Sequence, residues 1–284
     1  MVFKKAEKSK SLLRAAIFGP SGSGKTFTAL SIASGMAELL KTRIAFVDTE
    51  RGSASKYADR FDFDVVDLLE PKIEHYTQMF KDAEAAGYKV IVIDSLSHGW
   101  QQLLEEIETL AKAKYGGNSF RAWGEGTPKQ RDFIDALLAF NGHVIGTMRS
   151  KMDYLITQDE RGKQKIQRVG LAPEQGKGIE YEFDLLLELN PEHFANVLKD
   201  RTGRFQDKLI EKPGVDFGKQ LVAWLNEGCA EAKPLLNHEQ EKKALIDKCK
   251  VLQIPLDAAT MKTYGIERQI EVMKTLIAAK EAVK

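Results

Sequence analysis

The sequence of 284 residues contains only two cysteines, Cys229 and Cys249, and they lack metal-ligand spacing. This scarcity argues against a disulfide-rich scaffold. It predicts that both cysteines are reduced and serve as packing residues in a cytoplasmic protein. No apolar run approaches the roughly 20 residues of a membrane-spanning helix. No apolar segment follows the lysines of residues 1–14, so we expect neither a secretory signal nor a membrane partner.

A large excess of charge of either sign is also missing, because the formal net charge is +1. The chain therefore has no global basic field, and any surface that binds nucleic acid must be local. Hydrophobic residues make up 43% of the sequence, and no internal repeat is visible. This length and composition suit one large α/β domain with a small appendage.

The most informative stretch is Gly19-Pro20-Ser21-Gly22-Ser23-Gly24-Lys25-Thr26, which fits the phosphate-binding P-loop pattern. It lies between an expected strand, 14–18, and an expected helix, 26–40. Glycines let backbone N–H groups surround a polyanion, and the helix N-terminus faces the same phosphates. The alternative is a Gly/Ser-rich turn that contains lysine by chance. The pattern predicts ATP phosphates held by Gly19, Ser21, Gly22, Ser23, Gly24, Lys25, Thr26 and Phe27, with Thr26 also on Mg²⁺.

Acidic side chains follow two further expected strands. The stretch 43–52 is apolar and then acidic at Asp48 and Glu50, and the strand 88–95 ends at Asp94. Ligands bind at such carboxyl ends of parallel strands. Asp94 fits the Walker B position and is expected to serve as a catalytic Mg²⁺ ligand. Its alternative role is an ordinary helix N-cap.

The remaining pattern gives the expected domain organisation. Helices are expected at 73–86 and 103–114, a Gly- and aromatic-rich loop at 115–126, then a helix beginning at Thr127 and running to about 140. A strand at 143–149 precedes a long polar loop, 151–177. Strands at 181–189, 194–199 and 205–210 predict an antiparallel extension, followed by a helix at 217–226. We expect a flexible basic arm at 1–11, an ATPase core at 12–232 and a helical appendage at 233–284.

This order of strand, P-loop, helix and two acid-ended strands resembles the RecA-like ATPase core over residues 12–225. It is most similar to phage-encoded RecA-like ATPases of single-strand annealing or recombination. The resemblance implies an α/β fold, with a RecA-like P-loop NTPase core, a mostly parallel sheet, an antiparallel β extension and a small C-terminal helical appendage. It also implies an Mg²⁺-dependent ATPase, in the cytoplasm of a bacterial host, that binds single-stranded DNA. The implied protein partners are further copies of itself, in a ring or filament, and a single-strand-binding protein.

The resemblance also implies roles for individual residues. Glu50 would activate the attacking water, and Tyr57 would stack on adenine. Thr147 replaces the glutamine that senses the γ-phosphate, and Arg149 follows it. Lys199 and Arg201 resemble cations inserted into a neighbour's active site, and are implied to be catalytic there. Three of these roles have a plainer alternative: Glu50 as a solvated acid, Tyr57 as a core residue, and Lys199 with Arg201 as a solvated hairpin face.

Two segments are candidates for contacts with single-stranded DNA. The first contains Phe120, Arg121 and Trp123, which suit base stacking or, alternatively, core packing. The second contains the cations Lys151, Arg161, Lys163, Lys165 and Arg168. Two other functions remain open, namely a ring motor or loader that acts on a protein, and a nucleotide-binding scaffold with little turnover.

Overall fold

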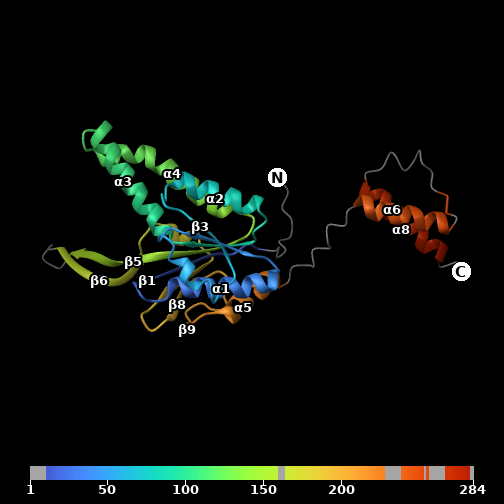
Figure 1. The fold of residues 1–284 in the computed structure, drawn as a ribbon. Coiled ribbons are helices and arrows are strands. Elements are labelled where there is room, and N and C mark those ends of the chain that lie inside the picture. Colours follow the sequence, from blue (N-terminus) through green and yellow to red (C-terminus); the bar gives the residue numbers. More distant parts are fainter. Residues whose placement is uncertain (1–10, 159–163, 228–237, 253, 256–265, 282–284) are drawn as a thin grey trace. The chain divides into compact units, whose positions relative to one another are not determined.

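The structure, a computed structural model, describes residues 11–158, 164–227, 238–252, 254–255 and 266–281. Contacts between residues divide the chain into a larger unit, Lys10–Glu227, and a smaller unit formed by the remaining residues. Each unit is described by itself below. In the larger unit a twisted sheet lies between two layers of helices (Figure 1).

The sheet is mostly parallel. Its order in space is β3-β2-β4-β5-β1-β7-β8-β9, with β6 paired to β5. The strands from β3 to β7 in this order run parallel, whereas β8 and β9 extend the sheet antiparallel. The predicted α/β class with an antiparallel extension is therefore confirmed. The strands are β1 (Arg14–Gly19), β2 (Ile44–Asp48), β3 (Asp64–Asp67), β4 (Val90–Asp94), β5 (His143–Gln158), β6 (Gln164–Pro173), β7 (Leu185–Leu189), β8 (Phe194–Asp200) and β9 (Leu209–Glu211).

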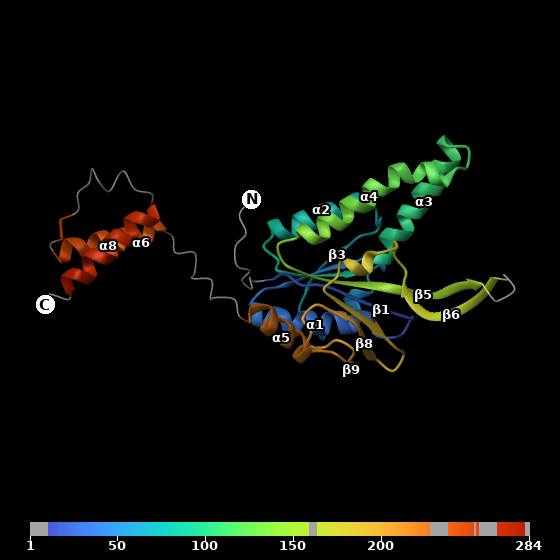
Figure 2. The same cartoon turned by 180° about the vertical axis from the view of Figure 1, so that it is seen from behind.

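Helices cover both faces of the sheet because its central strands are apolar on both sides. In Figure 2, α1 and α5 lie on one face, and α2, α3 and α4 lie on the other. Each layer buries its own hydrophobic cluster against the sheet. The helices of this unit are α1 (Lys25–Leu40), α2 (Ile73–Ala85), α3 (Leu96–Lys114), α4 (Ser119–Ala139) and α5 (Val215–Asn226), with short 3-10 turns η1 (Ala54–Tyr57) and η2 (Ile179–Tyr181).

The expected loop at 115–126 is largely wrong, because α4 already begins at Ser119. The Asn118 side chain accepts a hydrogen bond from the Arg121 N–H at 3.1 Å and so caps the helix. Gly126 does not break the helix but permits close packing of α3 on α4. A Cβ atom at Gly126 would lie 2.4 Å from Ile107 Cδ1. Pro128 is accommodated inside the same helix.

The expected loop at 151–177 is also wrong for most of its length. β5 continues beyond the parallel sheet and pairs antiparallel with β6, from Ser150↔Pro173 to Gln158↔Gln164. The resulting β5–β6 hairpin projects from the larger unit (Figure 1). The polar and glycine-containing composition of 151–177 did not indicate strands, and the pairing of β5 with β6 shows them.

Two smaller differences concern edge strands. The edge strand β3 was not expected, and the strand expected at 205–210 is shorter, because β9 spans only Leu209–Glu211. All four residues of β3 are exposed. Its Asp-Val-Val-Asp sequence therefore lacks the buried face that makes strands recognisable.

The smaller unit contains α6 (His238–Val251) and α8 (Ile266–Glu281) among its described residues. Cys249 on α6 is a free, buried cysteine that packs with Met273 and Ile277 of α8. Across the described ranges of both units, no helix is long and apolar enough to cross a membrane.

Candidate nucleotide-binding site

The P-loop connects the end of β1 to the start of α1, as its sequence predicts. Gly19 allows close packing of the loop on β7, because a Cβ atom there would lie 2.5 Å from the Leu189 carbonyl oxygen. Gly24 has a φ of 83°, in the left-handed region that favours glycine. The buried Ser23 donates its hydroxyl to the Pro20 carbonyl at 2.9 Å. The close packing of Gly19 and the Ser23 side chain therefore fix the shape of the loop.

Lys25 is the cation of this loop. Its Nζ donates to the carbonyl oxygens of Gly19 at 3.0 Å and Pro20 at 2.9 Å. Burial lowers the pKa of Lys25, and the nearby Asp94 and Glu50 carboxylates counteract that effect. The loop borders a cavity of about 310 Å³ lined by Gly19, Pro20, Ser21, Gly22, Gly24, Lys25, Thr26, Glu50, Tyr57, Asp94, Arg149 and Ser150.

Asp94 lies at the end of β4, opposite the P-loop helix. Its Oδ2 accepts a hydrogen bond from the Thr26 hydroxyl at 2.5 Å, and its Oδ1 accepts one from the Thr147 hydroxyl. Burial raises the pKa of Asp94, while these two hydrogen bonds lower it. The structure thus brings the expected pair of oxygen ligands, Thr26 and Asp94, into direct contact.

Thr147 and Arg149 occupy different surroundings, although both lie on β5. Thr147 is fully buried and contacts Asp94 rather than lining the cavity. Arg149 lines the cavity and forms an ion pair with Glu50 at 3.3 Å. Of these two residues, Arg149 is therefore the one placed to meet a phosphate.

The two acidic residues at the end of β2 and just after it differ in exposure, because Asp48 is buried and Glu50 is accessible. The buried Asp48 carboxylate accepts the backbone N–H groups of Glu50 at 2.6 Å and Ala54 at 2.8 Å. It therefore fixes the loop that carries Glu50. The Glu50 side chain is 36% exposed and faces the cavity, where it pairs with Arg149.

Thr49 and His98 connect β2 to the start of α3, and the sequence analysis missed both. The Thr49 hydroxyl accepts the Ser95 N–H at 2.7 Å and lies 2.6 Å from His98 Nδ1. Burial and, to a smaller extent, Arg149 lower the pKa of His98, so the free protein holds this imidazole neutral near pH 7. Its position four residues after Asp94, within the first turn of α3, is the signal that could have found it.

Aromatic side chains lie beside the P-loop. Phe27 contacts Tyr57 and Phe61 edge to face, with ring centroids 6.2 and 5.2 Å apart. Tyr57 lines the cavity and also packs against the neighbouring core, and its stacking on adenine stays a prediction. A second hollow of about 260 Å³ lies on the other side of Gly24 and is lined by Gly24, Phe27, Thr28, Ser31, His193, Lys212, Pro213 and Gly214.

His193 is a further residue that the sequence analysis missed. It lies in the turn between β7 and β8, and its Nδ1 is 3.0 Å from the Ser23 carbonyl oxygen. Its φ of 68° is unusual for a residue other than glycine. No motif marks this turn, because only the pairing of β7 with β1 brings it beside the P-loop.

Lys199 and Arg201 lie away from their own P-loop. Lys199 pairs with Leu186 near the start of β7, which is level with the first half of β1, whereas the P-loop follows the end of β1. Lys199 donates to the Glu180 and Tyr181 carbonyls, both at 2.9 Å, and Arg201 forms an ion pair with Asp184 at 3.0 Å. These cations are therefore separated from the site of their own chain.

The candidate DNA residues differ in exposure. Phe120 is 88% exposed and Arg121 is also exposed, whereas Trp123 stacks on Trp100 with ring centroids 5.7 Å apart. Lys151 is exposed on β5. Lys165 and Arg168 lie on β6, and Arg161 and Lys163 lie outside the described residues.

Comparison with known proteins now identifies the family. A family model described as an AAA domain matches residues 11–220. The chain belongs to this ATPase family. The match covers the P-loop and Asp94, both of which border the cavity described above.

The chain was also compared with solved structures and with curated proteins. Among similar solved structures is a KaiC-like protein of the hyperthermophilic archaeon Pyrococcus horikoshii, with 19% sequence identity and a TM-score of 0.39, covering 71% of this chain and 87% of that chain. A search of curated proteins found no significant match.

Proposed function

We propose that this ATPase hydrolyses ATP with Mg²⁺ and acts on single-stranded DNA in annealing or recombination. The observation that carries the proposal is the path of β5. One strand passes Thr147, which contacts Asp94, then Arg149 at the cavity, and continues into the β5–β6 hairpin. A change at the nucleotide can therefore reach the hairpin through a single covalent strand.

The residues around Asp94 fit a magnesium ion. Mg²⁺ prefers hard oxygen ligands, and it usually binds one or two protein groups together with substrate phosphates. The Thr26 hydroxyl and the Asp94 carboxylate are two such oxygens in contact with each other. When bound, the ion would neutralise charge that develops on the phosphates. Burial disfavours the charge on Asp94, so a cation here would also stabilise the carboxylate.

The remaining roles follow from position. Lys25 would exchange its loop carbonyls for the β- and γ-phosphates of ATP, because both are acceptors for the same ammonium. Glu50 would bind the attacking water and Arg149 would meet the γ-phosphate. Catalysis of phosphoryl transfer consists mostly of positioning and charge neutralisation. Lys25, Glu50 and Arg149 would supply both kinds of interaction. Adenine would lie against the aromatic group of Phe27 and Tyr57.

The β5–β6 hairpin supplies the proposed DNA contacts. Nine residues of β5, Ser150–Gln158, extend it by about 30 Å. Its sequence between 151 and 173 carries the five cations Lys151, Arg161, Lys163, Lys165 and Arg168 and the three acids Asp153, Asp159 and Glu160. Basic side chains along an extended arm suit a phosphate backbone.

The first turn of α4, next to the connection from α3, supports the same function. It carries the exposed Phe120 and Arg121, an aromatic ring and a cation of the kind that stack on bases. Figures 1 and 2 both show this turn projecting from the same side of the larger unit as the β5–β6 hairpin. The two projections would thus contact one strand together.

Fluorescence anisotropy with labelled single-stranded DNA, with and without ATP, tests the proposal. We expect ATP-dependent binding that is weaker for double-stranded DNA. Changing Arg161, Lys163 and Lys165 to Ala should weaken binding and reduce the salt slope by about 0.7 for each phosphate that the variant no longer neutralises. The matched control changes Lys41, Lys81 and Lys208, three lysines exposed elsewhere. Equal effects of the two triple variants, or no DNA binding at all, would contradict the proposal.

A further inference from the structure

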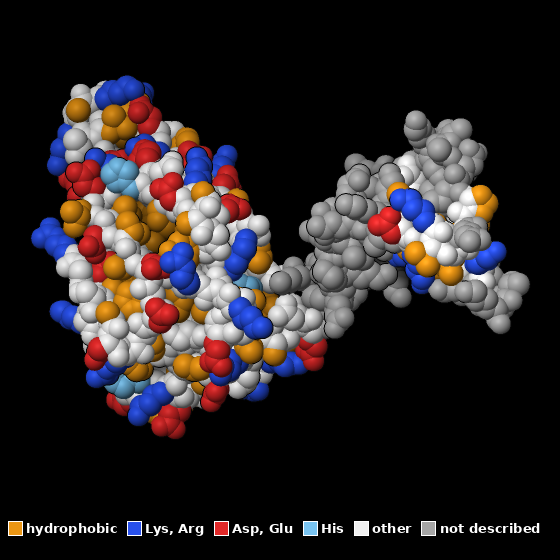
Figure 3. Space-filling model, turned by 45° about the vertical axis from the view of Figure 1, so that its right-hand side comes forward, with side chains coloured by type: hydrophobic (Ala, Val, Ile, Leu, Met, Phe, Trp, Pro, Cys, Tyr) orange, Lys and Arg blue, Asp and Glu red, His pale blue; other side chains and the backbone are white. Residues whose placement is uncertain are grey.

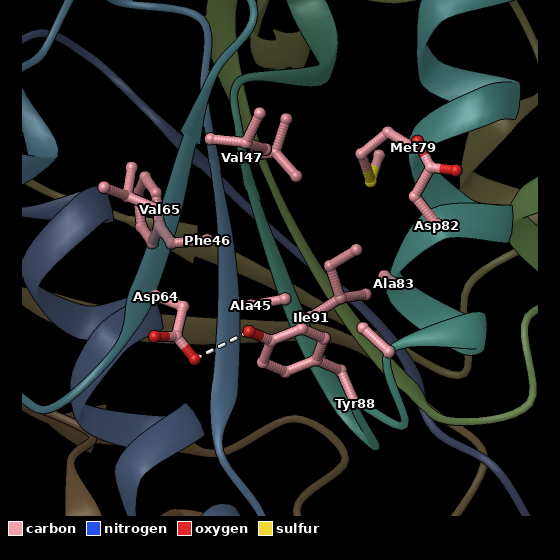
Figure 4. Close-up of a pocket in the computed structure, with 12 residues that line it drawn as sticks. Ala45, Phe46, Val47, Asp64, Val65, Met79, Asp82, Ala83, Tyr88 and Ile91 are labelled. Atoms are coloured by element: carbon pink, nitrogen blue, oxygen red, sulfur yellow. Dashed lines mark hydrogen bonds between the residues drawn. The ribbon is translucent and has the colours of Figure 1, made fainter.

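A hollow of about 250 Å³ at the β3 edge of the sheet is lined mostly by apolar side chains (Figure 4). Within it the Asp64 carboxylate accepts the Tyr88 hydroxyl at 2.7 Å, the dashed line in the figure, so this polar pair is satisfied without a ligand. Figure 3 shows acidic and basic side chains interspersed over one face of the larger unit, so charge alone does not mark a ligand site there. The 260 Å³ hollow beside Gly24 differs, because its lining includes His193, whose ring reaches the P-loop.

The imidazole of His193 donates a hydrogen bond to the P-loop. Its Nδ1 lies 3.0 Å from the Ser23 carbonyl oxygen. A carbonyl oxygen only accepts hydrogen bonds, so Nδ1 carries the proton in this contact. The ring also lies close to Gly24, because a Cβ atom at Gly24 would be 3.1 Å from Nδ1. One side chain from the turn between β7 and β8 therefore contacts two successive residues of the P-loop.

The backbone of the turn that carries His193 is held on both sides. The His193 N–H donates to the Asn190 carbonyl at 3.0 Å, and the His193 carbonyl accepts the Lys212 N–H at 3.1 Å. The Asn190 side chain also accepts the Phe194 N–H at 2.8 Å. His193 has a φ of 68°, in the left-handed region, which costs free energy for a residue with a Cβ atom. Glycine would avoid that cost, so the side chain rather than the turn explains the histidine.

The contact with Ser23 determines where the Gly24 N–H points. The peptide bond between Ser23 and Gly24 is trans. In a planar trans peptide the C=O and the N–H point in opposite directions. Because the Ser23 carbonyl is turned toward His193, the Gly24 N–H points away from His193. Gly24 borders the 310 Å³ cavity as well as the hollow that contains His193, so this N–H is directed to the side where the phosphates of ATP are expected.

We propose that His193 is a positioning residue for nucleotide binding, which holds the Ser23 carbonyl and so keeps the Gly24 N–H directed at the phosphates. Rotation of the peptide between Ser23 and Gly24 would turn the carbonyl oxygen toward the phosphates, and this negative end of the dipole would repel them. Gly24 has a φ of 83° and no Cβ atom, so its own sterics oppose that rotation only weakly. The hydrogen bond from His193 supplies the restraint. This inference rests on the nucleotide site of the proposed function and is independent of DNA.

Titration calorimetry of the full-length protein with ATP and with inorganic triphosphate, both with Mg²⁺, tests this role. His193→Gly removes the imidazole and accepts the same φ, so both affinities should fall by about three- to tenfold, the net effect of one hydrogen bond. His193→Asn also tolerates a positive φ, and its amide nitrogen lies as many bonds from Cα as Nδ1 does. Both affinities of this variant should stay near those of the wild type.

Asp207→Gly is the matched control. Asp207 is another exposed residue with a positive φ, 61°, and it lines neither the cavity nor the hollow beside Gly24. This variant should bind both ligands like the wild type. The urea midpoint of His193→Gly should fall no further than that of Asp207→Gly, so that a loss of affinity reflects the lost contact rather than a loss of folding.

Wild-type affinities in His193→Gly, or equal losses in His193→Gly and His193→Asn, would overturn the proposal. A loss confined to ATP would also overturn it, because His193 would then contact the nucleoside instead of orienting a phosphate-binding N–H. Lys25→Ala separates this inference from the proposed function. If Lys25→Ala binds triphosphate like the wild type, the nucleotide site is wrong and the inference fails with it. If Lys25→Ala loses binding and the His193 variants do not, the site stands and only the role of His193 is wrong.

Discussion

Thr147, inside β5, donates its hydroxyl hydrogen to Oδ1 of Asp94, at the end of β4. The Thr26 hydroxyl holds the other oxygen at 2.5 Å. Both contacts involve a carboxylate that burial would otherwise drive toward its neutral form. The fully buried Thr147 therefore supports the residue proposed to bind Mg²⁺ without facing the cavity itself.

Replacing Thr147 with valine should remove this support while preserving shape. A buried carboxylate oxygen left without its partner costs about 1–3 kcal/mol of folding free energy. We expect lower kcat for ATP hydrolysis and a lower urea midpoint, with both recovered in Thr147→Ser. Thr42→Val is the control, since its hydroxyl makes only an exposed contact with the Arg43 carbonyl. Wild-type turnover in Thr147→Val would show that the contact is irrelevant to Asp94.

The pH dependence of kcat/KM should reveal the buried Asp94. Burial raises its pKa, so as pH falls Asp94 takes up its proton at a higher pH than an ordinary aspartate. Protonation removes the charge that binds Mg²⁺, and activity should be lost as pH falls through that raised pKa. Because the Thr147 hydrogen bond lowers the pKa, Thr147→Val should move this acid limb to higher pH. A limb unmoved by the substitution would assign it to another group.

Glu50→Gln should separate nucleotide binding from hydrolysis. The amide keeps the size of the side chain but cannot accept the proton of the attacking water, and general base catalysis is worth about 10²–10⁴-fold. Single-turnover phosphate release should fall by that order while ATP affinity stays near wild type. Glu38→Gln, which changes an exposed acid paired with Lys219, is the control. Weakened ATP affinity with normal single-turnover hydrolysis would mean that Glu50 has a different role.

Lys199 and Arg201 provide a test of action between copies. Their position near the start of β7 separates them from their own P-loop, so any catalytic role must be in a neighbour. Arg201→Ala and Lys25→Ala should each be inactive alone. In a mixture some interfaces would pair an intact P-loop with an intact Arg201, and part of the turnover should return. A mixture that assembles but stays inactive would remove Arg201 from the chemistry.

The sequence alone located the parts of the candidate site where the chemistry requires a given type of residue at a given position in a local motif. The P-loop, Asp94 and the acidic end of β2 are of this kind, and so are the buried parallel strands. His193 could not be found, because it reaches the P-loop only through the pairing of β7 with β1. The partner of Thr147 likewise depends on register between strands.

The β5–β6 hairpin and the start of α4 were missed for a different reason. The segment 151–177 is polar and contains glycine, and α4 contains glycine where α3 packs closely. Local composition alone therefore suggested loops. The structure of the first segment depends on the pairing of β5 with β6, and that of the second on the close packing of α3 on α4.

The measurement closest to the central claim is phosphate release from ATP and Mg²⁺ while single-stranded DNA is titrated. The account predicts that wild-type turnover rises with DNA and saturates. Lys25→Ala should show no turnover at any DNA concentration, because it lacks the ammonium for the β- and γ-phosphates. Wild-type turnover that is independent of single-stranded DNA would contradict the coupling, and turnover in Lys25→Ala would contradict the nucleotide site itself.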